Sequence, residues 1–270
     1  MIVDLALVIP VYHCAGRLQR TLGELERFLE HSPVPCEVIL VDDRGTDPTA
    51  GSLLQDFARR PDVRLLCNDR NRGKGYSVRR GMLETTAALR IFTDADLAYP
   101  LDEVWRIAAA LHRGADVAIA TRVHAESRYH LDAGYLTYRY TRYAMSRAFN
   151  GMVRLALLPG LTDTQAGLKG YTARAAEDVF SRVGIGGFGF DLECLYLARQ
   201  LDLRVDQVPV RFQYDDEPST VRYLRDAVTM AGDLGRIRWR AWTGKYQLSP
   251  ACHTSGASSS TRTILVSREA

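Results

Sequence analysis

The chain has 270 residues, of which 46% are hydrophobic and 25% are charged, and its formal net charge is +3. This length suffices for one large globular domain with a sizeable core, and so small a net charge does not indicate nucleic-acid binding. The five cysteines are widely spaced and form no Cys-x-x-Cys pair, so neither a zinc site nor a disulfide framework is indicated and a reduced setting is favoured.

Neither secretion nor membrane insertion is predicted. The chain opens on a strand-like run rather than on a basic region followed by an apolar stretch and a cleavage site. No run of about 18 apolar residues, the length needed to span a bilayer, occurs in it. We therefore expect a cytoplasmic protein.

Strand-like and helix-like segments alternate through the first 120 residues. Short apolar runs predict strands, and apolar residues recurring every three or four positions predict helices. The expected strands are 5–11, 36–41, 63–67, 89–93 and 116–120, and the expected helices between them are 17–29, 52–60, 75–88 and 101–111. This alternation predicts an α/β fold with a mostly parallel sheet flanked by helices.

The second half of the chain has longer helical segments and a polar end. The expected helices are 135–158, 173–183, 191–200 and 220–242, with a loop at 161–171 and an extended segment at 205–214. From Gln247 onward the chain is rich in serine and threonine, which predicts a disordered tail over 247–270.

Acidic pairs end two of the predicted strands. Asp94 and Asp96 are one residue apart, so their side chains point to the same side if the strand conformation continues. Two such carboxylates can share a hard divalent cation, which in turn can hold a diphosphate. Asp42 and Asp43 end another strand, and functional groups of α/β sheets gather outside the carboxyl ends of the strands. Solvated strand ends are the alternative interpretation.

The segment Asn71-Arg-Gly-Lys-Gly75 precedes a predicted helix. Its glycines let the backbone approach a phosphate, and the helix N-terminus and Lys74 favour an anion, although a simple tight turn is the alternative. It is not a P-loop, because the first glycine of that motif is missing. The segment Gly184–Gly189 matches Gly-x-Gly-x-x-Gly, but it follows a helix instead of a first strand, and we discount it as a dinucleotide site.

Basic and aromatic residues are concentrated in two stretches of the second half, Arg128 to Arg154 and Ser219 to Tyr246, which overlap the expected helices 135–158 and 220–242. Amphipathic helices of this composition suit an anionic membrane interface or a lipid phosphate. A solvated face over an apolar core is the alternative.

In combination these segments resemble family 2 glycosyltransferases of the GT-A type, and more narrowly the dolichyl- or polyprenyl-phosphate mannose and glucose synthases. The resemblance extends over about residues 5–245, and it departs from the family pattern at His13 and at Arg44-Gly-Thr-Asp47. The segments that carry it are Val8-Ile-Pro-Val-Tyr12, Val41-Asp-Asp43, Asn71 to Met82, Asp94-Ala-Asp96, Asp163-Thr-Gln-Ala-Gly-Leu-Lys169 and Phe188-Gly-Phe-Asp-Leu-Glu193.

The resemblance implies a single GT-A type nucleotide-sugar-binding domain over 1–246, with a donor half at 1–121 and an acceptor-side half at 122–246. It implies that Asp94 and Asp96 bind Mg²⁺ or Mn²⁺, which bridges the diphosphate of a UDP- or GDP-hexose. The residues implied to contact this donor are Pro10, Tyr12, Asp42, Asp43, Asn71, Gly73, Lys74, Asp94 and Ala95.

The implied acceptor is a polyprenyl- or dolichyl-type lipid phosphate, met at the cytoplasmic membrane face by a peripheral protein. The candidates for holding its phosphate are Arg122, Arg128 and Arg211, with Arg139 and Arg142 as substitutes. Its oxygen is already anionic and needs positioning more than a strong base. The implied catalytic residues are Asp96, Gln165 and Asp191, the last as base if the acceptor is an alcohol, and the expected outcome is inversion at the sugar.

Two other functions stay open. One is a glycosyltransferase with the same donor site that acts on a soluble sugar or natural-product alcohol. The other is a non-catalytic binding protein on the same fold, which the intact Asp94 and Asp96 pair disfavours.

Overall fold

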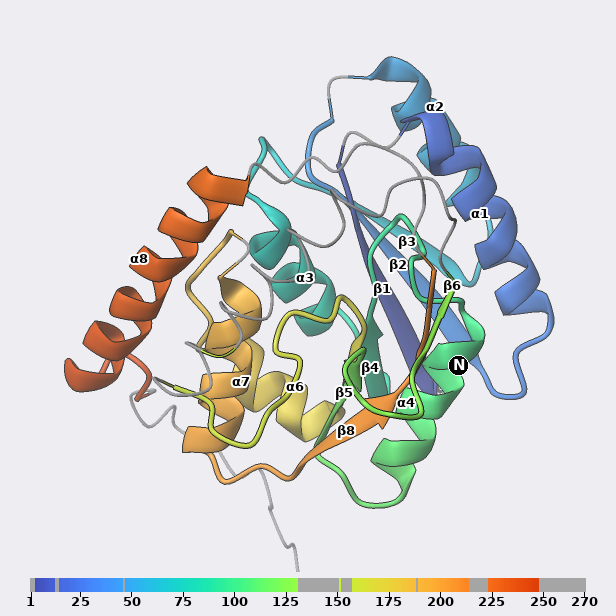
Figure 1. Cartoon of the computed structure of the whole chain (residues 1–270). Coiled ribbons are helices and arrows are strands. Elements are labelled where there is room, and N and C mark those ends of the chain that lie inside the picture. The colour runs from blue at the N-terminus through green and yellow to red at the C-terminus, as the bar shows by residue number, and fades with distance from the viewer. Residues whose placement is uncertain are drawn as a thin grey trace, which may run out of the picture.

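The structure is a computed structural model that describes residues 3–12, 15–45, 47–130, 151, 157–187, 189–213 and 223–247. Strands and helices alternate along these residues (Figure 1). In chain order they are β1 (Leu5–Val11), α1 (Ala15–Glu30), β2 (Cys36–Asp42), α2 (Pro48–Phe57), β3 (Val63–Cys67), α3 (Lys74–Leu83), β4 (Leu89–Phe92), α4 (Asp102–His112), β5 (Val117–Thr121), β6 (Arg128–His130), β7 (Lys169–Thr172), α6 (Ala173–Phe180), α7 (Phe190–Gln200), β8 (Val205–Pro209), β9 (Arg211–Gln213) and α8 (Tyr223–Trp242).

Seven of the described strands form one sheet in the order β3-β2-β1-β4-β7-β5-β8. All its neighbours pair in parallel except β7, which runs antiparallel to β4 and to β5. Val11 pairs with Asp42 and Val8 with Phe92, so β1, β2 and β4 end at the same edge of the sheet. The prediction of a mostly parallel α/β fold is confirmed.

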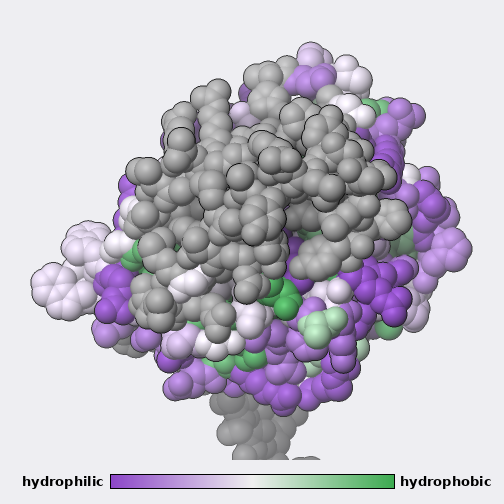
Figure 2. All heavy atoms as spheres, in the orientation of Figure 1, coloured by the Kyte–Doolittle hydropathy of each residue, from purple (hydrophilic) through white to green (hydrophobic). Residues whose placement is uncertain are grey.

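Helices cover both faces of this sheet, with α1, α2 and α4 on one face and α3, α6 and α7 on the other (Figure 1). Alternating side chains of β1 explain the two layers, since Leu7 packs with α1 and α4 while Val8 packs with α3. Helix α8 lies against α7, outside the sheet. The described surface in Figure 2 is mainly hydrophilic, as expected when the apolar faces of helices and sheet are buried together.

The prediction of a loop at 161–171 is wrong for its last three residues, because Lys169–Thr172 form β7 in the middle of the sheet. A lysine and a glycine in four residues give no apolar run or alternation from which a strand can be inferred. The side chain of Lys169 is nevertheless fully buried, and Gly170 leaves room for Ile107 of α4 against the strand.

Other boundaries differ less. Helix α3 ends at Leu83 instead of 88, and the extended segment at 205–214 contains two strands, β8 and β9. Strand β9 pairs in parallel with β6 in a separate two-stranded sheet. The predicted helix at 135–158 and the predicted tail lie almost wholly outside the described residues. Within the described part of the chain, no helix has the length and apolar character required to cross a membrane.

Candidate functional site

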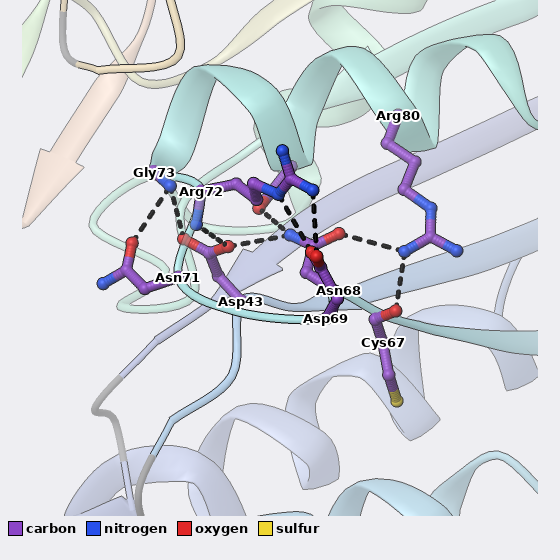
Figure 3. Close-up of polar contacts among 9 residues, drawn as sticks. Asp43, Cys67, Asn68, Asp69, Asn71, Arg72, Gly73 and Arg80 are labelled. Carbon is purple, nitrogen blue, oxygen red and sulfur yellow. Dashed lines mark hydrogen bonds and ion pairs between the residues drawn. The ribbon is translucent and has the colours of Figure 1, made fainter.

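Asp43 organises the loop before α3 (Figure 3). Its buried carboxylate accepts hydrogen bonds from the backbone N–H groups of Arg72 and Gly73, each at 2.8 Å, and from Asn68 Nδ2 at 2.7 Å. The Asn68 amide also donates to Ser77 Oγ on α3 at 2.9 Å. Both carboxylate oxygens of Asp43 therefore accept hydrogen bonds from the protein itself, and these bonds hold the loop in place.

Gly73 occupies a position in the same loop that has no room for a side chain. Its φ of +88° is in the region that favours glycine, and a Cβ there would lie 2.5 Å from the carbonyl oxygen of Gly186. Asn71 Oδ1 accepts a hydrogen bond from the Gly73 N–H at 3.0 Å. The loop therefore contacts Asp43 on one side and Gly186 on the other. These two contacts set the position of Lys74 at the start of α3.

Lys74 reaches from α3 to the end of β4. Its Nζ lies 2.5 Å from Asp94 Oδ1. Burial opposes the charge of the ammonium, but the carboxylates of Asp94, Asp191 and Asp96 outweigh this effect and raise the pKa of Lys74. Lys74 therefore carries a positive charge at neutral pH beside the Asp94 and Asp96 pair.

Asp94 and Asp96 are held by contacts from two directions. A Cβ on Gly167 would overlap the carboxylate of Asp94, so the 161–168 loop closes directly over it. On the other side, Thr21 Oγ1 of α1 donates to the carbonyl of Ala95 at 2.8 Å, and Asp96 Oδ1 accepts from the Ala98 N–H at 3.1 Å.

The chemistry of this pair fits a divalent cation. Desolvation and the neighbouring Asp94 carboxylate raise the pKa of Asp96, as expected for two acids that repel each other. Among the described residues no cluster of three or more His, Cys, Asp or Glu side chains is placed to hold a metal. Two carboxylates leave most positions of Mg²⁺ or Mn²⁺ to water and to ligand oxygens, the arrangement usual for metals that carry a bound phosphate.

Tyr12 and Asp42 line a small cavity at the carboxyl ends of β1 and β2, together with Gly45 and residues of α2. Asp42 Oδ1 accepts a hydrogen bond from the Gly45 N–H at 3.3 Å. Asp47 instead caps α2 by accepting from the Thr49 N–H at 2.8 Å. Pro10, which pairs with Val41 in the sheet, brings the chain to this cavity.

Arg122 follows β5 and is locked onto Asp163. Its Nε and Nη2 donate to the two carboxylate oxygens of Asp163 at 2.7 and 2.9 Å, and its backbone N–H donates at 3.0 Å. Burial opposes ionisation of Asp163, but the bonds from Arg122 hold the pKa of its carboxyl below the usual value. The guanidinium also lies 5.4 Å from the ring centre of Phe212 in β9.

Strands β6 and β9 place Arg128 and Arg211 opposite each other. Arg128 is exposed, whereas Arg211 Nε donates to Glu103 Oε1 at 2.7 Å and its Nη2 lies 3.3 Å from Asp102. The Gln213 N–H of β9 donates to the Ala98 carbonyl at 2.8 Å. This β6–β9 ribbon therefore runs beside the loop that follows Asp96.

Lys169 also belongs to the site, although the sequence pattern predicted no role for its side chain. Its fully buried Nζ lies 2.5 Å from Asp191 Oδ1 and donates to the Ala166 carbonyl at 2.6 Å. Asp191, at the start of α7, is thus an oriented, ion-paired carboxylate. Gln165 lies in the loop between Asp163 and Gly167, partly exposed.

Residues 6–180 of the chain match the family model described as Glycosyl transferase family 2. Proteins named dolichyl-phosphate beta-glucosyltransferase are similar to most of the chain. The one from Drosophila melanogaster is 32% identical over 260 residues, which are 91% of this chain and 78% of that protein. The one from Dictyostelium discoideum is 29% identical over 255 residues, covering 90% and 76%, and the one from Homo sapiens is 29% identical over 254 residues, covering 91% and 78%.

Solved structures with the same fold include glucosyl-3-phosphoglycerate synthase from Mycobacterium tuberculosis in complex with Mn²⁺, UDP and glucosyl-3-phosphoglycerate. It has a TM-score of 0.62 at 15% identity and covers 87% of this chain and 79% of its own. Mannosyl-3-phosphoglycerate synthase from Rubrobacter xylanophilus has a TM-score of 0.62 at 16% identity, covering 94% and 78%. At this identity the likeness shows the fold, and it confirms the GT-A type architecture.

Replacing Asp43 tests the loop network. In Asp43→Asn the amide retains one acceptor oxygen but turns an NH₂ toward backbone donors, so the free energy of unfolding should fall by about 1–3 kcal/mol. Urea denaturation measures this change. The control is Asp69→Asn in the same segment, whose carboxylate forms a solvent-exposed pair with the Arg72 side chain at 2.9 Å, so this change should leave stability nearly unchanged. Equal losses in the two variants would contradict a special role for Asp43.

Proposed function

The chain belongs to glycosyl transferase family 2, and we propose that it transfers glucose from UDP-glucose to a polyprenyl- or dolichyl-type lipid phosphate. One observation carries this proposal: Asp94 pairs with the cationic Lys74, and the loop that follows Asp96 contacts the arginine-bearing β6–β9 ribbon. A site of this form can hold a diphosphate and a second phosphate next to each other.

The donor half of the proposal rests on the edge where β1, β2 and β4 end. Tyr12 and Asp42, which line a small cavity at the ends of β1 and β2, would contact the nucleoside. The diphosphate would then lie near Lys74 and the N-terminus of α3, where charge and helix dipole both favour an anion. The names of the relatives support glucose as the sugar, and the UDP bound in structures of the same fold supports uridine as the nucleoside.

A divalent ion at Asp94 and Asp96 would supply charge neutralisation for the leaving nucleotide. The chain's own contribution is to hold both carboxylates in place, through Gly167 on one side and the Thr21 contact to Ala95 on the other. Lys74 adds a fixed positive charge at the same position. We propose Mg²⁺ or Mn²⁺ as the ion, because the ligands are hard oxygens.

The acceptor half requires positioning of an oxygen that is already anionic. Arg128 is exposed on the ribbon and would bind the lipid phosphate directly. Arg122 would contribute from a guanidinium kept in place by Asp163 and Phe212, while Arg211 would have to share its charge with Glu103. Because Asp191 is paired with Lys169, the proposed reaction proceeds without a strong base. A single in-line displacement by the acceptor oxygen would invert the configuration at the sugar.

A lipid acceptor also requires contact with a membrane, and we propose that the protein is peripheral and uses α8. Trp239 and Trp242 of this helix are 51% and 86% exposed. Arg236 and Arg238 are exposed on the same helix. Exposed indoles among basic side chains favour the interface of an anionic membrane.

The membrane contact can be measured by co-sedimentation with phosphatidylglycerol vesicles. A Trp239→Ser and Trp242→Ser double variant should reduce the bound fraction several-fold, because the indoles supply the apolar contact. Val34→Ser, which removes an exposed apolar side chain elsewhere, should bind like the wild type. Equal binding by all three proteins would exclude α8 as the docking helix.

Donor, metal and acceptor can be tested in one screen. UDP-glucose and GDP-mannose are each offered with polyprenyl phosphate or a soluble hexose, in Mg²⁺, Mn²⁺ or EDTA, and products are separated by solvent extraction. We expect transfer from UDP-glucose to the lipid only when metal is present, and a loss of at least about a hundredfold in Asp96→Ala. Transfer in EDTA, or to the hexose alone, would contradict the proposal.

Replacing Arg128 distinguishes binding of the acceptor from binding of the donor. Loss of a charge-assisted bond in Arg128→Ala should raise the KM for lipid phosphate about tenfold, while the KM for the sugar nucleotide changes less than about twofold. Arg113→Ala, at an exposed position just after α4, serves as the charge-matched control. A similar rise in both KM values would count against the assignment of Arg128 to the acceptor.

A further inference from the structure

Glu193 is a buried carboxylate that the proposed reaction does not use. It lies on α7, two residues after Asp191, and its side chain has no exposed surface. Its two oxygens bind different parts of the protein. Oε2 accepts hydrogen bonds from the backbone N–H groups of Gly184 at 2.9 Å and Ile185 at 2.7 Å.

The other oxygen, Oε1, binds the C-terminal part of the described chain. It accepts a hydrogen bond from the Tyr246 hydroxyl at 2.8 Å and lies 3.3 Å from Arg240 Nε of α8. Arg240 also lies 5.2 Å from the ring centre of Tyr246, and Arg182 Nε donates to the Tyr246 carbonyl at 3.1 Å. Glu193 thus joins α8, which lies outside α7 in Figure 1, to the 184–187 loop.

The 184–187 loop in turn contacts the donor site. The carbonyl of Gly186 accepts hydrogen bonds from the backbone N–H groups of Gly75 at 2.7 Å and Tyr76 at 3.3 Å, in the first turn of α3. The same carbonyl faces Gly73. The contacts therefore run without interruption from Glu193 through Gly186 to the turn that carries Lys74.

On its other side the 184–187 loop borders an open groove. The groove has a volume of about 350 Å³ and lies between the loop and α8, with Thr229, Asp233, Arg236 and Trp239 on the α8 side. At Gly184 the guanidinium of Arg240 packs directly against the loop, and Glu193 Oε2 binds the backbone N–H groups of Gly184 and Ile185. Glu193 and α8 therefore set the position of the loop together.

We propose that Glu193 is a positioning residue for the nucleotide-sugar donor, acting through the 184–187 loop on the first turn of α3. The inference rests on the proposed function, because it takes the diphosphate of the donor as the group that Lys74 and this turn contact. It adds that the packing of α8 against Glu193 sets donor affinity.

Because the two oxygens of Glu193 bind different parts of the protein, variants can separate its effect on donor affinity from an effect on general stability. In Glu193→Gln, one set of donors faces an amide NH₂ in either orientation of the side chain, so the loop or α8 loses its acceptor. Tyr246→Phe removes only one hydrogen bond, on the α8 side. Glu37→Gln is the matched control, because Glu37 is also largely buried and paired, with Arg64 and Thr85, but lies near the amino end of β2.

The experiment is calorimetric titration of each full-length protein with UDP in Mn²⁺, together with KM and kcat for UDP-glucose. We expect Glu193→Gln to raise the Kd for UDP and the KM for UDP-glucose about tenfold, roughly 1.4 kcal/mol, with kcat and the acceptor KM changed less than about twofold. Tyr246→Phe should raise the Kd for UDP about twofold to threefold, and Glu37→Gln should not change it.

Unchanged UDP affinity in a folded Glu193→Gln protein overturns the inference, as does an equal loss in Glu37→Gln. If Glu193→Gln does not fold, Tyr246→Phe decides, and wild-type UDP affinity in that variant overturns the inference. Failure of the wild type to bind UDP overturns the proposed function and this inference together. Normal UDP binding without transfer to lipid overturns only the proposed acceptor.

Discussion

The parallel register of β1, β2 and β4 is the constraint on which the site depends. Because these strands run in one direction and end at the same edge, Tyr12, Asp43 and Asp94 emerge together although they are far apart in the sequence. Asp43 uses this position to bind backbone N–H groups of the loop before α3, and that loop delivers Lys74 to Asp94. The carboxyl ends of these strands thereby fix the relative positions of the charged side chains of Asp94 and Lys74.

The antiparallel strand β7 supplies the second half of the site. Its insertion between β4 and β5 brings the preceding loop back over the end of β4, which places Gly167 against Asp94. It also carries Lys169 into the interior, where only an ion pair makes a buried ammonium acceptable. Asp191 supplies that pair, so the start of α7 is tied to the same strand. Removing either partner would leave an uncompensated charge in the core.

Much of this arrangement could be predicted from the sequence, and the exceptions have physical causes. Strands with continuous apolar runs, such as Leu5–Val11, were evident, and so was the grouping of acidic residues at their ends. Strand β7 was not, because Lys169 and Gly170 interrupt any hydrophobic pattern. The partners of Asp43 are backbone N–H groups, which have no signature in side-chain type. Glu193 likewise binds the loop before α7 and Tyr246, which follows α8, and only the tertiary packing brings these groups together.

Anomalous diffraction at the manganese edge, from crystals grown with Mn²⁺ and UDP, would locate a metal-assisted donor site at the end of β4. We expect one strong peak within bonding distance of carboxylate oxygens of Asp94 and Asp96, with the diphosphate of UDP next to it. A manganese ion bound elsewhere in the chain, or UDP bound away from this edge of the sheet, would contradict this expectation.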